Sequence, residues 1–153
     1  ICHRVSDGTG VLRAIGSGLI AGGIALGCAF GYQALLVMTG LIDQPPEHPL
    51  LVQDPSARWW FAGLAVLAAP ACEEFIFRGL VFRGLRRIAS ASASICVSAL
   101  IFSLVHPPIA MLPVFCLGIA TAVAFERSKL LIAAIVAHMT YNLVVVALPL
   151  ANS

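Results

Sequence analysis

The chain has 153 residues, of which 60% are hydrophobic and 10% are charged, with a mean hydropathy of +0.99 and a net charge of +2. Soluble domains carry about 25% charged residues. The composition therefore excludes an ordinary soluble domain and predicts an all-α, polytopic transmembrane bundle of about five spans. The sequence has no basic run with interleaved aromatic residues that would indicate nucleic-acid binding. Its hydropathy makes the lipid bilayer the expected partner.

The first predicted span runs from Val11 to Gly40 and is long enough to cross the membrane with some tilt. It carries glycines at small-xxx-small spacings, which predict a close contact with another helix. The connection from Leu41 to Ala57 is polar. We expect its four prolines to break any helix there; they are Pro45, Pro46, Pro49 and Pro55.

The second predicted span, Arg58 to Ile88, contains Pro70, which should kink the helix or loosen its hydrogen-bond ladder. The paired prolines at 107–108 stop the third span, because a residue before proline is driven out of the helical region. The remaining spans are predicted at Ser90–His106, Ile109–Phe125 and Leu130–Leu150.

Basic residues concentrate on one side of this arrangement, which the positive-inside rule makes cytoplasmic. Trp59 and Trp60 begin the second span at the other side, as interfacial anchors do. The basic residues are Arg4, Arg13, Arg83, Arg86, Arg87, Arg127 and Lys129.

A few strongly polar side chains remain inside the predicted spans. A charge there costs about 2.5–3.5 kcal/mol on insertion scales, so such groups usually face the bundle interior and serve a function. Glu74 and Arg78 are four residues apart and should pair on one helix face. Glu73 lies about 100° around the helix and is left to face the centre. The others are His106, His138 and Asn142.

The depths of these groups in the membrane allow a meeting. Glu73 lies ten residues from Arg83, or about 15 Å along a helix, and His138 lies nine from Lys129, or about 13–14 Å. His106 is farther along its span. A shared layer therefore requires the third span to begin deep or to tilt.

These residues suit two kinds of hydrolysis. Glu73 can act as general base on water that a histidine orients, while a second histidine and the Asn142 amide donate to the oxyanion. Alternatively, Glu73, His106 and His138 form a His₂Glu set for zinc with an open position. A proton relay in a transporter would use the same groups.

The chain resembles the CPBP intramembrane proteases, which include CAAX prenyl endopeptidases and bacteriocin-processing or immunity (Abi) proteins. Three motifs carry the resemblance, in order, over about residues 59–148. EExxxR stands at Glu73–Arg78, FxxxH at Phe102–His106 and HxxxN at His138–Asn142. On this basis we expect residues 59–150 to form a peptidase core, preceded at 1–58 by a membrane helix and a proline-rich extracytoplasmic loop.

The resemblance implies an intramembrane endopeptidase acting on membrane-associated proteins or peptides. Glu73 and His106 would activate the water, and His138 and Asn142 would support the oxyanion. Glu74, Arg78 and Phe102 would support these four. Both zinc-dependent and metal-free mechanisms fit the family, and we favour the metal-free one, with no cofactor. The alternative is a non-catalytic immunity or binding protein. We expect a multi-pass protein of the bacterial inner membrane.

Overall fold

The computed structural model describes residues 8–43 and 55–151, and these ranges contain helices and no strand. The predictions for Arg4 and for residues 44–54 of the proline-rich connection lie outside the described residues. The elements are α1 (Gly8–Met38), α3 (Pro55–Gly63), η1 (Leu64–Ala68), α4 (Ala69–Glu74), η2 (Phe75–Phe82), α5 (Arg83–Leu85), α6 (Ala91–Leu104), η3 (Pro108–Ala110), α7 (Met111–Ser128) and α8 (Leu131–Ala151).

Four helical stretches in the described ranges are long and apolar enough to cross a membrane. Each corresponds to a predicted span, so the multi-pass helical bundle is confirmed. The remaining prediction, the third span at Ser90–His106, corresponds to α6, whose 14 residues fall short of the about 20 that a full crossing needs. The four stretches are Gly8–Met38, Ala57–Leu85, Pro108–Ser128 and Leu131–Leu148.

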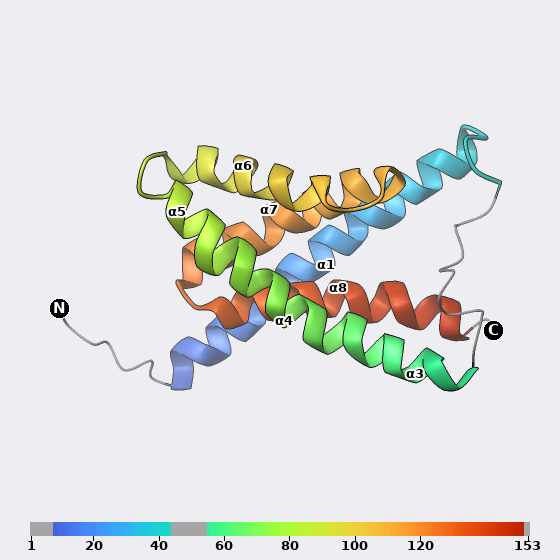
Figure 1. The fold of residues 1–153 in the computed structure, drawn as a ribbon, viewed down its shortest axis with the longest axis horizontal. Helices are drawn as coiled ribbons and strands as arrows, with labels where there is room; N and C mark the ends of the chain where they lie inside the picture. Colours follow the sequence, from blue (N-terminus) through green and yellow to red (C-terminus); the bar gives the residue numbers. More distant parts are fainter. Residues whose placement is uncertain (1–7, 44–54, 152–153) are drawn as a thin grey trace.

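The second span is one continuous rod built from α3 to α5 (Figure 1). Two of its segments, η1 and η2, are π-helical, and they flank the short α4 that carries the carboxylates. Because η1 ends two residues before Pro70, the predicted loosening of the helix is confirmed. The expectation that Pro55 breaks the helix is wrong, since α3 begins at this residue. Proline fits the first helical turn, where its missing N–H has no helical partner.

The short α6 solves the problem of depth that the sequence raised for His106. The Ser90 hydroxyl accepts from the Ala93 N–H at the start of the helix. Fourteen residues then cover about 21 Å, less than the roughly 30 Å of a hydrocarbon core. In Figure 1 the turn between α6 and α7 stops short of the ends of α1, α3 and α8. His106 follows α6 in this turn and is partly buried.

Helix α1 packs closely against α8, the helix that carries His138. A Cβ atom added at Gly18 would stand 2.5 Å from the Ala133 carbonyl oxygen, and one at Gly22 would stand 2.6 Å from that of Ala137. Only glycine allows the two backbones to approach this closely. The predicted close helix contact is therefore confirmed at these two positions, immediately behind the site.

A cluster of charges marks the end of the bundle at which the second span leaves the membrane. Glu126 Oε1 lies 2.8 Å from Lys129 Nζ and 3.5 Å from Arg86 Nε. These side chains are 21%, 66% and 34% exposed, in that order. Together with Phe82, Arg83 and Phe125 they line a hollow of about 230 Å³.

Candidate active site

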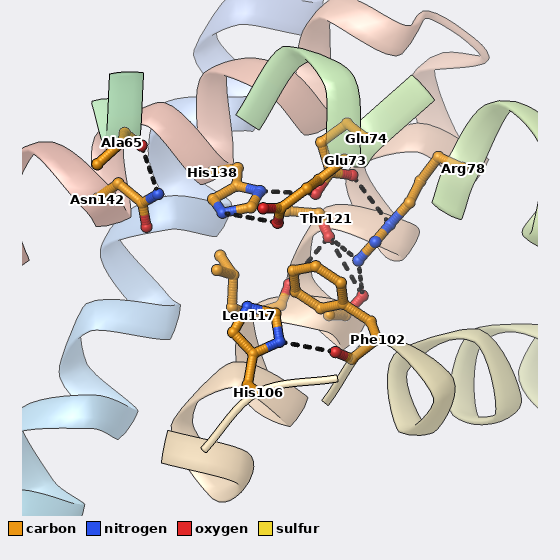
Figure 2. Close-up of polar contacts among 11 residues, drawn as sticks. Ala65, Glu73, Glu74, Arg78, Phe102, His106, Leu117, Thr121, His138 and Asn142 are labelled. Atoms are coloured by element: carbon orange, nitrogen blue, oxygen red, sulfur yellow. Dashed lines mark hydrogen bonds and ion pairs between the residues drawn. The ribbon is translucent and has the colours of Figure 1, made fainter. Parts of the chain in front are cut away.

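A buried ion pair forms one side of the site. Arg78 Nε lies 3.0 Å from Glu74 Oε2, and both side chains are fully buried. From α7, the Gly118 carbonyl accepts a 2.8 Å hydrogen bond from Arg78 Nη2, and the Thr121 hydroxyl accepts a second one. The expected pairing of Glu74 with Arg78 is thus present in the structure, and Arg78 is also bonded to α7 (Figure 2).

Thr121 is a contact of Arg78 that the sequence analysis missed. Its hydroxyl donates to the Leu117 carbonyl at 3.0 Å, which leaves the oxygen lone pairs for the guanidinium. A threonine in an apolar helix usually bonds back to its own helix, so it attracts little notice. The sequence did indicate that Arg78 needs a further acceptor, because a guanidinium has five N–H donors and one carboxylate cannot satisfy them all.

His138 contacts both adjacent carboxylates. Its Nδ1–H donates to Glu74 Oε1 at 2.9 Å, and its Nε2 lies 3.9 Å from Glu73 Oε2. The ring is nearly fully buried. The meeting of Glu73 and His138 was predicted, but the bond from Glu74 to His138 was not. That bond fixes the orientation of the ring and leaves Nε2 toward Glu73.

Glu73 is held more loosely than its neighbour. Its side chain is 33% exposed, whereas that of Glu74 is fully buried. Within the described residues, Glu73 Oε2 and Glu74 Oε2 are both buried atoms without a hydrogen bond. Glu74 Oε2 nevertheless lies 3.0 Å from Arg78 Nε, whereas Glu73 Oε2 lies 3.9 Å from His138 Nε2. The two carboxylates therefore differ as the helical spacing predicted: Glu74 is bound on both sides, and Glu73 keeps an oxygen for other partners.

Phe102 is a fully buried aromatic ring that packs against the charged groups. Its centroid lies 4.9 Å from that of His106 and 5.6 Å from that of His138, both in edge-to-face geometry. The Arg78 Cζ atom lies 4.9 Å from the same centroid, close enough for a cation–π contact. One ring thus joins residues from three parts of the chain.

His106 follows the last turn of α6, where its ring bonds back to the helix. Its Nδ1 lies 2.9 Å from the Phe102 carbonyl oxygen. A carbonyl only accepts, so Nδ1 carries the hydrogen and Nε2 keeps its lone pair. In the described residues no hydrogen bond or ion pair joins His106 to Glu73 or His138. Figure 2 shows its ring beneath that of His138, with Phe102 beside both.

The same three motifs lie inside a match to a family model. Residues 55–144, more than half of the chain, match the type II CAAX prenyl endopeptidase Rce1-like family. The chain belongs to this family. No curated protein and no solved structure matches the chain.

Membership makes the chain a multi-pass member of a family of CAAX-type intramembrane proteases, which act on membrane-embedded protein substrates. The match extends from α3 into α8 and leaves α1 outside. Helix α1 nevertheless packs, through Gly18 and Gly22, against the part of α8 that lies inside the match. The division of the chain at residue 58 stays a prediction.

The metal set expected as an alternative is not assembled in this CAAX-type protein. Among the described residues, no three or more His, Cys, Asp and Glu side chains converge in a way that suits a metal ion. Glu73 and His138 approach each other, while His106 stands apart and is joined to Phe102 instead. Zinc therefore has no formed ligand set here, and the choice between the two mechanisms stays a prediction.

Asn142, the last residue of the third motif, was expected to face the oxyanion, and in the structure it contacts the backbone of the second span. Its Nδ2 donates to the Ala65 carbonyl in η1 at 2.8 Å. Figure 2 shows this contact on the side of His138 away from Arg78. One amide N–H is therefore already engaged, and only the second is left for a substrate.

Proposed function

We propose that the protein is an intramembrane endopeptidase that hydrolyses peptide bonds of membrane-associated proteins with water activated by Glu73 and His106. One observation carries the proposal. Glu73 Oε2, a buried oxygen without a hydrogen bond among the described residues, lies 3.9 Å from Nε2 of the buried His138. A general base needs this combination of a free lone pair and a fixed neighbour.

In the proposed reaction, Glu73 takes a proton from a water molecule whose oxygen attacks the scissile carbonyl carbon. The lone pair on His106 Nε2 orients this water. Negative charge moves to the carbonyl oxygen, where a protonated His138 Nε2 stabilises it. The carbon–nitrogen bond then breaks, and the leaving amine takes the proton from Glu73. The products are one carboxylate and one amine.

Glu74 and Arg78 serve this reaction without touching the substrate. Glu74 holds His138 through Nδ1, so the imidazole presents Nε2 to the reacting atoms. Arg78 compensates the charge of Glu74 at 3.0 Å. The arrangement resembles other hydrolytic sites in which a buried carboxylate orients a catalytic histidine.

Access to the site fits a substrate that arrives within the membrane. The Glu73 side chain is 33% exposed in the middle of a spanning helix, while its Oε2 atom, which faces His138, is buried. We propose a membrane-associated protein or peptide as the substrate, with a prenylated CAAX peptide as the first to be assayed. A bacterial inner membrane is the proposed location.

The test is cleavage of a farnesylated CAAX peptide, and of the same peptide without the lipid, by purified protein in detergent. Glu73→Ala, His106→Ala and His138→Ala should each abolish cleavage. Glu126→Gln, an acidic residue outside the site, is the matched control and should cleave like the parent. If the three site variants cleave as well as the parent, the proposed peptidase function is wrong, and a binding or immunity function takes its place.

The metal question has its own test, which uses active protein. We expect dialysis against a chelator to leave cleavage unchanged and metal analysis to find no stoichiometric zinc. Zinc that is lost together with activity, and restores it when added back, would replace the metal-free mechanism by the zinc-dependent one.

A further inference from the structure

The backbone carbonyl of Ala65 has lost both of its helical partners. In an α-helix it would accept from the Ala69 N–H, but that N–H bonds to the Leu64 carbonyl in the π-helical geometry of η1. In a π-helix the partner would be residue 70, which is a proline without an N–H. Pro70 is itself fully buried. A carbonyl freed in lipid costs several kcal/mol unless another group satisfies it.

Asn142 supplies the missing donor from another helix. Its Nδ2 lies 2.8 Å from the Ala65 carbonyl oxygen, a distance typical of a well-formed hydrogen bond. Neighbouring helices and their polar side chains are known to satisfy carbonyls that prolines release in membrane helices. The contact is therefore the complement of the proline and not a chance approach.

The same face of α8 also carries His138, four residues earlier. Helix α8 thus holds the second span at two points, one before Pro70 and one after it. Asn142 binds the backbone of η1, and His138 binds the carboxylates of α4. Attachments on both sides of Pro70 set the angle between the two parts of the second span, and this angle sets the direction of the Glu73 side chain.

We propose that Pro70, Ala65 and Asn142 form a latch that positions Glu73 against His138. Pro70 releases the carbonyl, and Asn142 captures it. In the proposed peptidase, on which the catalytic part of this inference rests, Asn142 is then a positioning residue that acts through the helix backbone. Its effect on the rate passes through Glu73.

The test is a double-mutant cycle with Pro70→Ala and Asn142→Ala, read by melting midpoint in detergent and by kcat and KM. Asn142→Ala leaves the carbonyl unpaired, so the midpoint falls and kcat drops up to about 100-fold with KM unchanged. In the Pro70→Ala background, the new N–H at position 70 can bond within the helix. The additional loss from Asn142→Ala should then shrink to less than half, in both readouts.

Two further variants sharpen the cycle. Asn142→Leu keeps roughly the size but has no donor for the carbonyl, so it should behave like Asn142→Ala. Pro113→Ala is the matched proline control, because Pro113 lies in the first turn of α7 and its missing N–H has no helical partner. It should leave the effect of Asn142→Ala unchanged.

The outcomes separate the latch from the proposed function. If Asn142→Ala costs the same in both proline backgrounds, the latch is wrong and a direct contact with the oxyanion is the better explanation. If the parent cleaves nothing, the proposed function falls, and the cycle in melting midpoints still decides whether the latch exists. Rescue of the midpoint without rescue of kcat would retain the bond and overturn its positioning role.

Discussion

Two charged clusters of this protein each pair a carboxylate with nitrogen-containing side chains, in opposite surroundings. Around Glu74, carboxylate, guanidinium and imidazole groups are fully or almost fully buried, with contacts of 2.9–3.0 Å. Around Glu126, at the end of the bundle, the contacts with Lys129 and Arg86 measure 2.8 Å and 3.5 Å, on side chains that are 21–66% exposed.

The difference teaches that distance alone does not decide what an ion pair contributes. Water screens the exposed cluster, and pairs of this type contribute about 0–1 kcal/mol. In the buried cluster a lost partner leaves an uncompensated charge, which costs about 3–5 kcal/mol. Within the buried cluster Glu73 is the more loosely held carboxylate, because its contact with His138 measures 3.9 Å whereas those of Glu74 measure 2.9 Å and 3.0 Å.

The largest effect is expected from Arg78→Met. It removes the cation from a fully buried pair, so the free energy of unfolding should fall by about 3–5 kcal/mol. Denaturant unfolding in micelles measures it, with Arg127→Met, an exposed arginine at the end of the bundle, as the control. A loss below about 1 kcal/mol would mean that burial does not separate the two clusters as argued.

Glu73→Gln should affect the reaction and leave the fold intact. The amide keeps the shape but cannot take a proton, so kcat should fall about 10²–10⁴-fold while the melting midpoint stays near that of the parent. Glu74→Gln is the informative partner, because it should lower the midpoint as well. If Glu73→Gln unfolds the protein and Glu74→Gln does not, the assignment of the two carboxylates is reversed.

Thr121→Val should give an intermediate effect. The methyl group replaces a hydroxyl that accepts from Arg78, so a buried donor loses its partner and stability should fall by about 1–3 kcal/mol. Thr121→Ser keeps the oxygen and should restore most of this loss. Equal losses in both variants would assign the role of Thr121 to its methyl group and to packing.

The smallest effect is expected from Lys129→Met in the exposed cluster. It breaks the 2.8 Å contact with Glu126, yet stability should change by only about 0–1 kcal/mol. The change should shrink further between 0.05 and about 1 M salt, where the Debye length is about 3 Å. A large, salt-independent loss would show that this end of the bundle is shielded from solvent.

Much of the site followed from local spacing. Glu74 and Arg78 are one helical turn apart, and Glu73 is rotated by about 100°, so any helix through this stretch pairs the first two and frees the third. The match of depth between Glu73 and His138 followed in the same way from the rise per residue. By contrast, Thr121 and Ala65 were missed, because their partners lie on other helices.

The length of α6 also escaped prediction. The apolar pattern runs on to His106, but the helix ends at Leu104, so the imidazole bonds back to the last turn. Hydropathy reports how apolar a stretch is, and it does not register where the last helical hydrogen bond falls. Pro55 gives a similar case. Proline breaks a helix when it lies in the interior, but Pro55 lies at the first position of α3, where proline is favoured.

The sequence by itself determined that this is a helical membrane protein, and it predicted the four stretches that are long and apolar enough to cross the bilayer and the residues proposed to carry the chemistry. These follow from hydropathy, from periodicity along one helix and from motifs, all of which are local. Only the tertiary structure decided that Glu74 holds His138, that Thr121 receives Arg78 and that Asn142 binds Ala65. Helices in lipid pack through small residues and scattered polar contacts, and periodicity along one helix does not reveal which partner it meets.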